Sequence, residues 1–284
     1  MKLQLYTDRM SQPSRAVLIL CKASGIDFEE IKVEISKRQQ LSPEFEAINP
    51  FKKLPAIVDG RFKLFESSII ICFAIPVPVR GDGSMWFNKT SFIWNSEPDI
   101  CHAILIYIAS AFPGVANHWY PADLTRRAKI HSVLDWHHLN LRQGAAPYIL
   151  HTVLAPVLGL PSSRQAAAEA EKILTSSLSK IESIWLKGNG RYLLGSFQPS
   201  IADLSMVCEI MQLELLDEKD RDRILGPHKK VQQWIESTRN ATKPHFDEVH
   251  NVLYKMKLKL SLQRSNQVEG VKESRIKTPL TSKI

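Results

Sequence analysis

A serine at the start of a predicted helix is the first residue of this sequence that could do chemistry. Ser11 lies in the segment Met10-Ser11-Gln12-Pro13, where serine is a favoured N-cap and proline suits the first helical turn. A hydroxyl at this position stands at the positive end of the helix dipole, where negative charge is stabilised. A plain helix cap without a chemical role is the alternative that these residues leave open.

A second group of polar residues shares one face of a later predicted helix. His131, Asp135 and His138 are spaced i, i+4 and i+7, so they could in principle bind a metal ion. A hydrogen-bonded polar face is the more common arrangement, and we therefore predict no metal site.

The four cysteines form no CxxC pair and have no metal-like spacing with a histidine. We interpret them as reduced thiols of a soluble intracellular protein rather than as a disulfide framework. Cys21 and Cys208 fall on apolar helix faces, where a buried and inert thiol is expected.

The elements that must position Ser11 follow the order strand, helix, strand, helix, strand, strand. Alternating apolar residues predict strands at 2–6 and 28–35, and the helix that begins at Ser11 ends at a glycine. Ser42-Pro43-Glu44 begins a short second helix, and the Asp-Gly pair within 54–64 predicts a hairpin. This order fits a thioredoxin-like α/β domain, although order alone fits other folds too.

From Leu124 onward the apolar periodicity is helical. We predict helices from Leu124 to Leu139 and over 170–185, 204–215 and 231–235. The third of these follows Ser200-Ile201-Ala202-Asp203, a capping box in which the serine caps the helix amides and the carboxylate reaches back. An α/β domain is therefore followed by an all-helical one.

Composition limits the classes of partner. Apolar residues make up 44% of the 284 residues, enough to bury a core, and no apolar run is long enough to span a bilayer. The net charge is +8, but residues 255–284 contribute +6 of it, and we interpret them as a basic, flexible tail. A nucleic-acid-binding fold would carry its basic patch on the folded part, so we expect neither a nucleic acid nor a membrane as partner.

Two segments together resemble the glutathione-binding region of the glutathione transferases. One runs from Met10 to Ala16, and the other from Asn49 through Leu54-Pro55 to Ser67. The serine near the first helix and the later His118-Trp119-Tyr120-Pro121-Ala122-Asp123-Leu124 resemble the plant type of the theta class in that family. The capping box before the third C-terminal helix is also typical of the superfamily.

The resemblance implies the glutathione transferase fold, an α/β thioredoxin-like N-terminal domain plus an all-α C-terminal domain. The first would span residues 1–112 and bind glutathione, and the second would span residues 113–254 and bind the other substrate. Such an enzyme conjugates glutathione to hydrophobic electrophiles or reduces organic hydroperoxides with it. Glutathione would be a co-substrate, no cofactor would be permanently bound, and two copies would form a homodimer.

The role that the resemblance implies for Ser11 is to donate a hydrogen bond to the sulfur of glutathione. A free thiol has a pKa of about 8.5, and lowering it by about two units requires about 2.7 kcal/mol. One hydrogen bond to a charged group supplies about 1.5–3 kcal/mol, and the helix N-terminus adds about 0.3–1 kcal/mol. One hydroxyl in this position is therefore enough to form the thiolate.

The resemblance also implies which residues hold the rest of the tripeptide. Leu54, before a cis-proline, would pair with the ligand's backbone as an extra strand would. Glu66 would accept the γ-glutamyl ammonium, and Ser67, at a helix start, would bind the γ-glutamyl carboxylate.

Five further residues receive weaker assignments from the resemblance. Gln40, Leu41 and Lys53 would contact the glycyl end, and Gln12 would contact the ligand through its backbone. Arg127 matches a position where theta enzymes carry an arginine near the sulfur, and a surface salt bridge is its alternative role.

Residues 68–101 interrupt the resemblance. In the family, the pair that corresponds to Glu66 and Ser67 leads straight into a helix, but the expected continuation appears here only at His102. Removing these 34 residues restores the family sequence. We interpret them as a retained intron or a gene-model error, which sequencing of the transcript would test. A tolerated loop is the alternative, because long insertions add little loop-closure entropy.

The last three residues, Ser282-Lys283-Ile284, resemble the Ser-Lys-Leu peroxisomal address, so we expect a location in the cytosol and the peroxisome. The alternative function is a non-catalytic ligand-binding protein or an interaction module on the same fold, possible if the insertion has inactivated the enzyme. The intact Ser11 favours the enzyme.

Overall fold

The structure is a computed structural model that describes residues 2–65 and 102–276, with side chains as far as residue 262. Several sequence predictions lie outside these residues: the insertion 68–101, the pair Glu66 and Ser67, and the tripeptide Ser282-Lys283-Ile284.

One four-stranded sheet, in the order β2-β1-β3-β4, forms the N-terminal region. β1 (Leu3–Thr7) pairs parallel with β2 (Phe28–Lys32) and antiparallel with β3 (Ala56–Asp59). β4 (Phe62–Phe65) pairs antiparallel with β3, so these two strands form the predicted hairpin. The order and the parallel first pair confirm the thioredoxin-like α/β prediction.

Helix α1 (Gln12–Ala23) begins and ends where its local signals predict. The Ser11 side chain accepts a hydrogen bond from the Ser14 amide, and Pro13 occupies the first turn. Gly25 ends the helix with φ +66°, a conformation that glycine adopts without strain.

The second strand is shorter than the predicted 28–35. It ends at Lys32, because the chain then turns: the Ile35 amide donates to the Asp8 carboxylate at 2.9 Å. Two short 3₁₀ helices follow, η1 (Ile35–Lys37) and η2 (Gln39–Leu41). The predicted helix at Ser42-Pro43-Glu44 is confirmed as α2 (Pro43–Glu46), which Ser42 caps.

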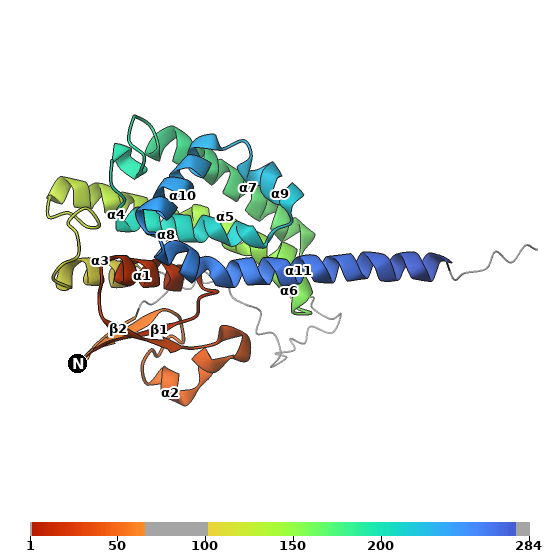
Figure 1. Cartoon of the computed structure of the whole chain (residues 1–284), viewed down its shortest axis with the longest axis horizontal. Coiled ribbons are helices and arrows are strands. Elements are labelled where there is room, and N and C mark those ends of the chain that lie inside the picture. Colours follow the sequence, from red (N-terminus) through yellow and green to blue (C-terminus); the bar gives the residue numbers. More distant parts are fainter. Residues whose placement is uncertain (1, 66–101, 277–284) are drawn as a thin grey trace, which may run out of the picture.

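The described chain from residue 102 onward is built from helices. In chain order they are α3 (His102–Ala111), α4 (Leu124–Leu139), α5 (Leu141–Ile149), η3 (Leu150–Leu154), α6 (Ala155–Val157), α7 (Arg164–Lys180), η4 (Ile181–Trp185), η5 (Leu193–Gly195), α8 (Ile201–Ile210), η6 (Met211–Leu215), α9 (Glu218–Leu225), α10 (Lys229–Ala241) and α11 (His245–Ile276). Helices α1 and α3 lie side by side between the sheet and the other helices, and the far end of α11 projects from the body (Figure 1).

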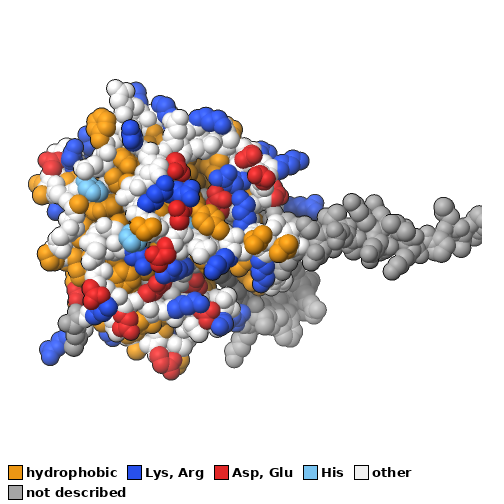
Figure 2. All heavy atoms as spheres, viewed as in Figure 1, with side chains coloured by type: hydrophobic (Ala, Val, Ile, Leu, Met, Phe, Trp, Pro, Cys, Tyr) orange, Lys and Arg blue, Asp and Glu red, His pale blue; other side chains and the backbone are white. Residues whose placement is uncertain are grey.

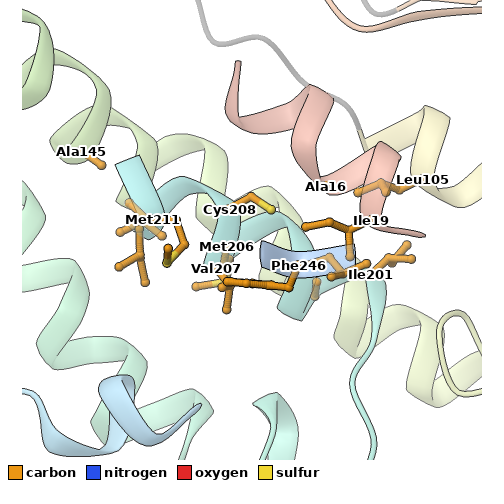
Figure 3. Close-up of a cluster of buried hydrophobic side chains, with 14 of the residues drawn as sticks. Ala16, Ile19, Leu105, Ala145, Ile201, Met206, Val207, Cys208, Met211 and Phe246 are labelled. Carbon is orange, nitrogen blue, oxygen red and sulfur yellow. The ribbon is translucent and has the colours of Figure 1, made fainter. Parts of the chain in front are cut away.

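The core centres on α8, every residue of which is buried. Its apolar side chains meet those of α1, α3 and α11, as the cluster of Ala16, Leu105, Val207 and Phe246 shows (Figure 3). A helix that is buried on all sides lies at the centre of a domain, and the polar residues of α8 are therefore expected to have partners.

The predicted capping box holds the start of α8. The Asp203 carboxylate accepts from the Ser200 amide at 2.7 Å and from the Ser200 hydroxyl at 2.8 Å. Its other oxygen accepts from the Leu193 amide at 3.0 Å and from the Trp234 indole at 2.8 Å. Burial raises the pKa of Asp203, and these four hydrogen bonds oppose that rise.

One expectation about the helices is wrong. Leu124 and Leu139, two of the apolar residues whose periodicity predicted α4, are 78% and 62% exposed, whereas Leu134 is buried together with Ile130 and Val133.

In the basic tail predicted from residue 255, the structure shows that α11 continues to Ile276. Leu253 and Leu260, two turns apart on α11, are buried, and the helix packs against η6 and α1. This packing stabilises α11 as far as Leu260, despite the basic composition of the segment.

Basic and acidic side chains are interspersed on the face of the molecule that Figure 2 shows. Within residues 2–65 and 102–276, no helix is both long enough and apolar enough to cross a bilayer.

Candidate functional site

The Ser11 hydroxyl is the reactive-group candidate, and the structure leaves its proton available. Ser11 is 6% exposed, and its amide donates to the Asp8 carbonyl at 2.9 Å. Its Oγ accepts from the Ser14 amide at 3.5 Å and donates to no acceptor in the described part of the chain. A donor therefore stands at the positive end of α1, suited to a negatively charged atom of a ligand.

A buried arginine fixes the backbone that leads into the serine. Arg15 is fully buried, and its Nη1 donates to the carbonyls of Arg9 and Met10 at 2.9 and 3.0 Å. Its Nη2 donates to the Cys208 carbonyl at 2.9 Å and to Gln212 Oε1 at 2.8 Å. Burial lowers the pKa of Arg15 to about 10, so the guanidinium stays charged at neutral pH.

A buried carboxylate fixes the same loop from the other side. Asp8 Oδ1 accepts from the Met10 amide, and Oδ2 accepts from the Ile35 amide, each at 2.9 Å. The turn that carries Ser11 is thereby tied to the chain that enters η1 and η2, where Gln40 and Leu41 lie.

The loop before β3 is held by a buried asparagine. Asn49 Nδ2 donates to the Lys53 carbonyl at 2.8 Å, and its Oδ1 accepts from the Phe51 amide at 2.9 Å. The Leu54–Pro55 peptide bond is cis, as the sequence resemblance predicts. The Leu54 side chain is buried beside Phe45 in a small separate core.

Gln40 and Leu41 lie on an element next to that small core. Both lie in η2, which packs against α2, and the Phe45 side chain of α2 is part of the core that contains Leu54. Gln40 Oε1 is buried and accepts no hydrogen bond from the described residues. Because buried acceptors are nearly always satisfied, this oxygen is suited to a ligand N–H.

The predicted binding residues divide into those that the structure positions and those that lie outside it. Ser11 and Gln12 lie at the start of α1, and Gln12 Nε2 donates to Glu209 Oε1 of α8 at 3.4 Å. Lys53 is half-buried beside Leu54. Glu66 and Ser67 lie outside the described residues.

Arg127 does not make the surface salt bridge that was its alternative role, within the part of the chain that the structure describes. Its Nε donates to the Pro121 carbonyl at 2.6 Å, and its guanidinium carbon lies 4.5 Å from the centre of the Tyr120 ring. None of these contacts is with Ser11, and the role of Arg127 near the sulfur stays a prediction.

Of the remaining polar candidates, His131 has a structural partner in Tyr120. His131 Nε2 lies 2.8 Å from the Tyr120 hydroxyl, and burial lowers the pKa of His138 to about 4. No group of three metal-ligating side chains occurs among residues 2–65 and 102–262. Cys21 and Cys208 are buried, and burial raises the pKa of both thiols, that of Cys208 to about 12. The prediction that these two cysteines are buried is confirmed.

Sequence reasoning missed the residues that position the site, namely Asp8, Arg15, Asn49 and Glu209. The signal for Arg15 and Glu209 was a charged residue inside an otherwise apolar helical stretch. Such a residue is rarely buried unless it holds something in place.

Comparisons with known proteins agree with this arrangement. Residues 1–73 match the family described as the glutathione S-transferase N-terminal domain. The match passes Ser67 and so extends into the first residues of the segment 68–101.

Whole-chain relatives extend the comparison to the helices. Glutathione S-transferase T1 of Arabidopsis thaliana is 60% identical over 257 residues, which are 90% of this chain and 91% of that protein. Glutathione S-transferase T2 of the same plant is 59% identical over 264 residues, 93% of this chain but only 39% of that longer protein. A human theta-class glutathione transferase, in complex with the glutathione conjugate of 1-menaphthyl sulfate, has a similar structure. Its TM-score is 0.73 at 27% identity, with 93% of this chain and 92% of that chain covered.

Proposed function

Because this chain belongs to the theta class of the glutathione S-transferase family, we propose that it conjugates glutathione to hydrophobic electrophiles and reduces organic hydroperoxides with it. One observation supports the proposal: the Ser11 hydroxyl, at the N-terminus of α1, donates to no acceptor among the described residues and can therefore donate to a ligand. Glutathione is the co-substrate in this proposal, and the protein contributes hydrogen bonds and orientation.

The proposed mechanism follows from where the serine stands. The Ser11 hydroxyl donates a hydrogen bond to a glutathione sulfur that lies beyond the N-terminus of α1. Its Oγ still accepts a hydrogen bond from the Ser14 amide. The hydrogen bond and the helix terminus stabilise the thiolate more than the thiol, so the pKa of the bound thiol falls. In conjugation the thiolate attacks the electrophilic carbon, and the leaving group departs with the electron pair of the bond that breaks. In hydroperoxide reduction the thiolate attacks the peroxide oxygen, the O–O bond breaks, and the alkoxide leaves and takes up a proton. A second glutathione then reacts with the sulfenic acid so formed, giving glutathione disulfide and water.

The direct test is the ionisation of bound glutathione. Thiolate absorbance as a function of pH should give a pKa below the free value of about 8.5 for the intact chain. Ser11→Ala should return the pKa towards the free value and lower kcat/KM with both an electrophile and a hydroperoxide. Unchanged ionisation and activity in Ser11→Ala would refute the proposal.

Ser163→Ala is the matched control for the loss of a helix cap. Ser163 caps α7 and accepts from the Ala166 amide at 3.2 Å, as Ser11 does from Ser14, but it lies in the helical region. This variant should keep the thiol pKa. Retention on immobilised glutathione without any conversion would instead favour the non-catalytic module.

We also propose that two copies form a homodimer. Phe51 and Phe62 of the N-terminal region are 51% and 45% exposed, and each lies beside a second aromatic ring, Phe65 and Tyr107 respectively. Exposed aromatic side chains of this kind are enriched where proteins associate. Light scattering should give twice the chain mass, and a monomer at micromolar concentration would count against the proposal.

A location in the cytosol and peroxisome stays a proposal. It rests on the sequence Ser282-Lys283-Ile284, which lies outside the described residues.

A further inference from the structure

A chain of polar side chains runs through the interior from α3 to α1. His102 Nε2 lies 3.0 Å from Ser205 Oγ, which lies 3.1 Å from His137 Nδ1. His137 Nε2 lies 3.5 Å from Glu209 Oε2, and Gln12 Nε2 lies 3.4 Å from Glu209 Oε1. The chain therefore ends at the residue that follows Ser11.

Glu209 is the charged member of this chain. Its side chain is 1% exposed, and Arg142 Nη1 donates to Oε2 at 2.7 Å. Burial alone would raise the pKa of Glu209, but the charge of Arg142 and the neighbouring His137 outweigh it, so the pKa lies below its usual range. The carboxylate is therefore ionised in the interior of the protein at neutral pH.

An ionised carboxylate only accepts hydrogen bonds, so it determines the orientation of its neighbours. Gln12 must turn its NH₂ group towards Glu209, and its amide oxygen must then face the opposite way. An uncharged partner would not impose this choice, because the two ends of an amide are nearly the same in shape. The charge of Glu209 thus fixes which end of the Gln12 amide is presented at the start of α1.

The same chain has the order serine, histidine, glutamate, which nucleophilic enzymes use. Ser205 and His137 are only 4% and 5% exposed, so a substrate has no access to this serine. Positioning is the role that the geometry supports for these residues.

We propose that Glu209 is a positioning residue for glutathione, because it holds the Gln12 amide oxygen ready to accept from an N–H group of the tripeptide. This inference rests on the proposed function, since it places the ligand beside Ser11. Gln12 is half-buried, is the first residue of α1 and directly follows Ser11, so its side chain starts next to the proposed position of the ligand. Glutathione carries both an ammonium and peptide N–H groups that could donate.

The test is a double-mutant cycle in the full chain, with Gln12→Met, Glu209→Gln and both together. Each single variant should raise KM for glutathione about tenfold, the effect of one lost hydrogen bond, while kcat changes little. Because Glu209 acts through Gln12, the double variant should be no worse than Gln12→Met alone. A Gln12→Met chain with unchanged KM, or single effects that multiply in the double variant, would overturn the inference.

Two further measurements separate positioning from folding. Gln12→Met leaves the buried Glu209–Arg142 pair intact, so it tests the inference even if Glu209→Gln is unstable to heat. Glu214→Gln is the matched control. The Glu214 side chain is also mostly buried, and its Oε1 forms an ion pair with Arg221 Nη2 at 2.7 Å. This control should leave KM for glutathione unchanged.

Two other results complete the assignment. A glutathione analogue without the ammonium identifies the donor. If the ammonium donates, Gln12→Met should not raise KM for this analogue any further. If Gln12→Met still raises KM, a peptide N–H donates. Loss of thiol ionisation in Ser11→Ala, with no effect of Gln12→Met, would reject this inference while keeping the proposed function.

Discussion

Replacing Arg15 by lysine should loosen the backbone before Ser11 without removing the positive charge. The guanidinium reaches four acceptors at 2.8–3.0 Å, two on the loop before the serine and two on α8 and η6. A single ammonium nitrogen cannot reach both sides, so at least two buried acceptors lose their donor. At about 1–3 kcal/mol for each unsatisfied buried group, the free energy of unfolding should fall by at least about 2 kcal/mol.

Two assays test this prediction on Arg15→Lys. Urea unfolding gives the loss of stability, and thiolate absorbance gives the pKa of bound glutathione, which should rise towards about 8.5 as Ser11 becomes less fixed. Arg223→Lys is the control, because Arg223 is an exposed arginine that pairs with Glu171 and Asp220. Wild-type stability and an unchanged thiol pKa in Arg15→Lys would refute the reasoning.

Four other outcomes are expected. Asp203→Asn should lower the midpoint of urea unfolding, because an amide cannot accept all four hydrogen bonds that the carboxylate accepts; an unchanged midpoint would contradict this. Gly144→Ala should destabilise by about 1–3 kcal/mol, since its Cβ would lie 2.4 Å from the backbone nitrogen of Leu174 in the α5–α7 contact; calorimetry would measure it. The pKa of Glu209 lies below its usual 4.5 in the folded state, so its ionised form stabilises the protein above pH 4.5 and this contribution is lost as pH falls. Glu209→Gln should therefore be less stable than the parent at pH 7, and the difference in urea midpoint should shrink towards pH 4. Deleting residues 68–101 should strengthen retention on immobilised glutathione if the segment is foreign to the fold, and weaker retention would favour the tolerated loop.

Local signals predicted much of the fold. The caps at Ser11, Ser42 and Ser200, and the turn between β3 and β4, depend on residues a few positions apart, so the sequence displays them directly. The helix α5 was missed because a proline and a glycine interrupt its pattern, although packing against α7 supplies its stability. Which residues of α4 face the core depended on its neighbours, and periodicity alone placed Leu124 wrongly.

The site was predicted only as far as its local motifs extend. Ser11, Gln12 and Leu54 belong to short segments with a recognisable pattern. The residues that hold them act across the chain: Arg15 meets Gln212, and Gln12 meets Glu209, each across 197 positions of sequence. No pattern within one helix could show such pairs, because tertiary packing alone brings them together.

The burial of α1 has a consequence for how the protein unfolds. Nine consecutive residues of this helix, Pro13 to Cys21, are buried, because α8 and α11 pack against it as well as the strands. Pulling the sheet region away from the other helices would expose the face of α1 that packs on α8 and α11 and would strip the Arg15 charge of half its partners. The two regions should therefore melt in a single cooperative transition, and a fragment that ends at residue 112 should fail to fold by itself.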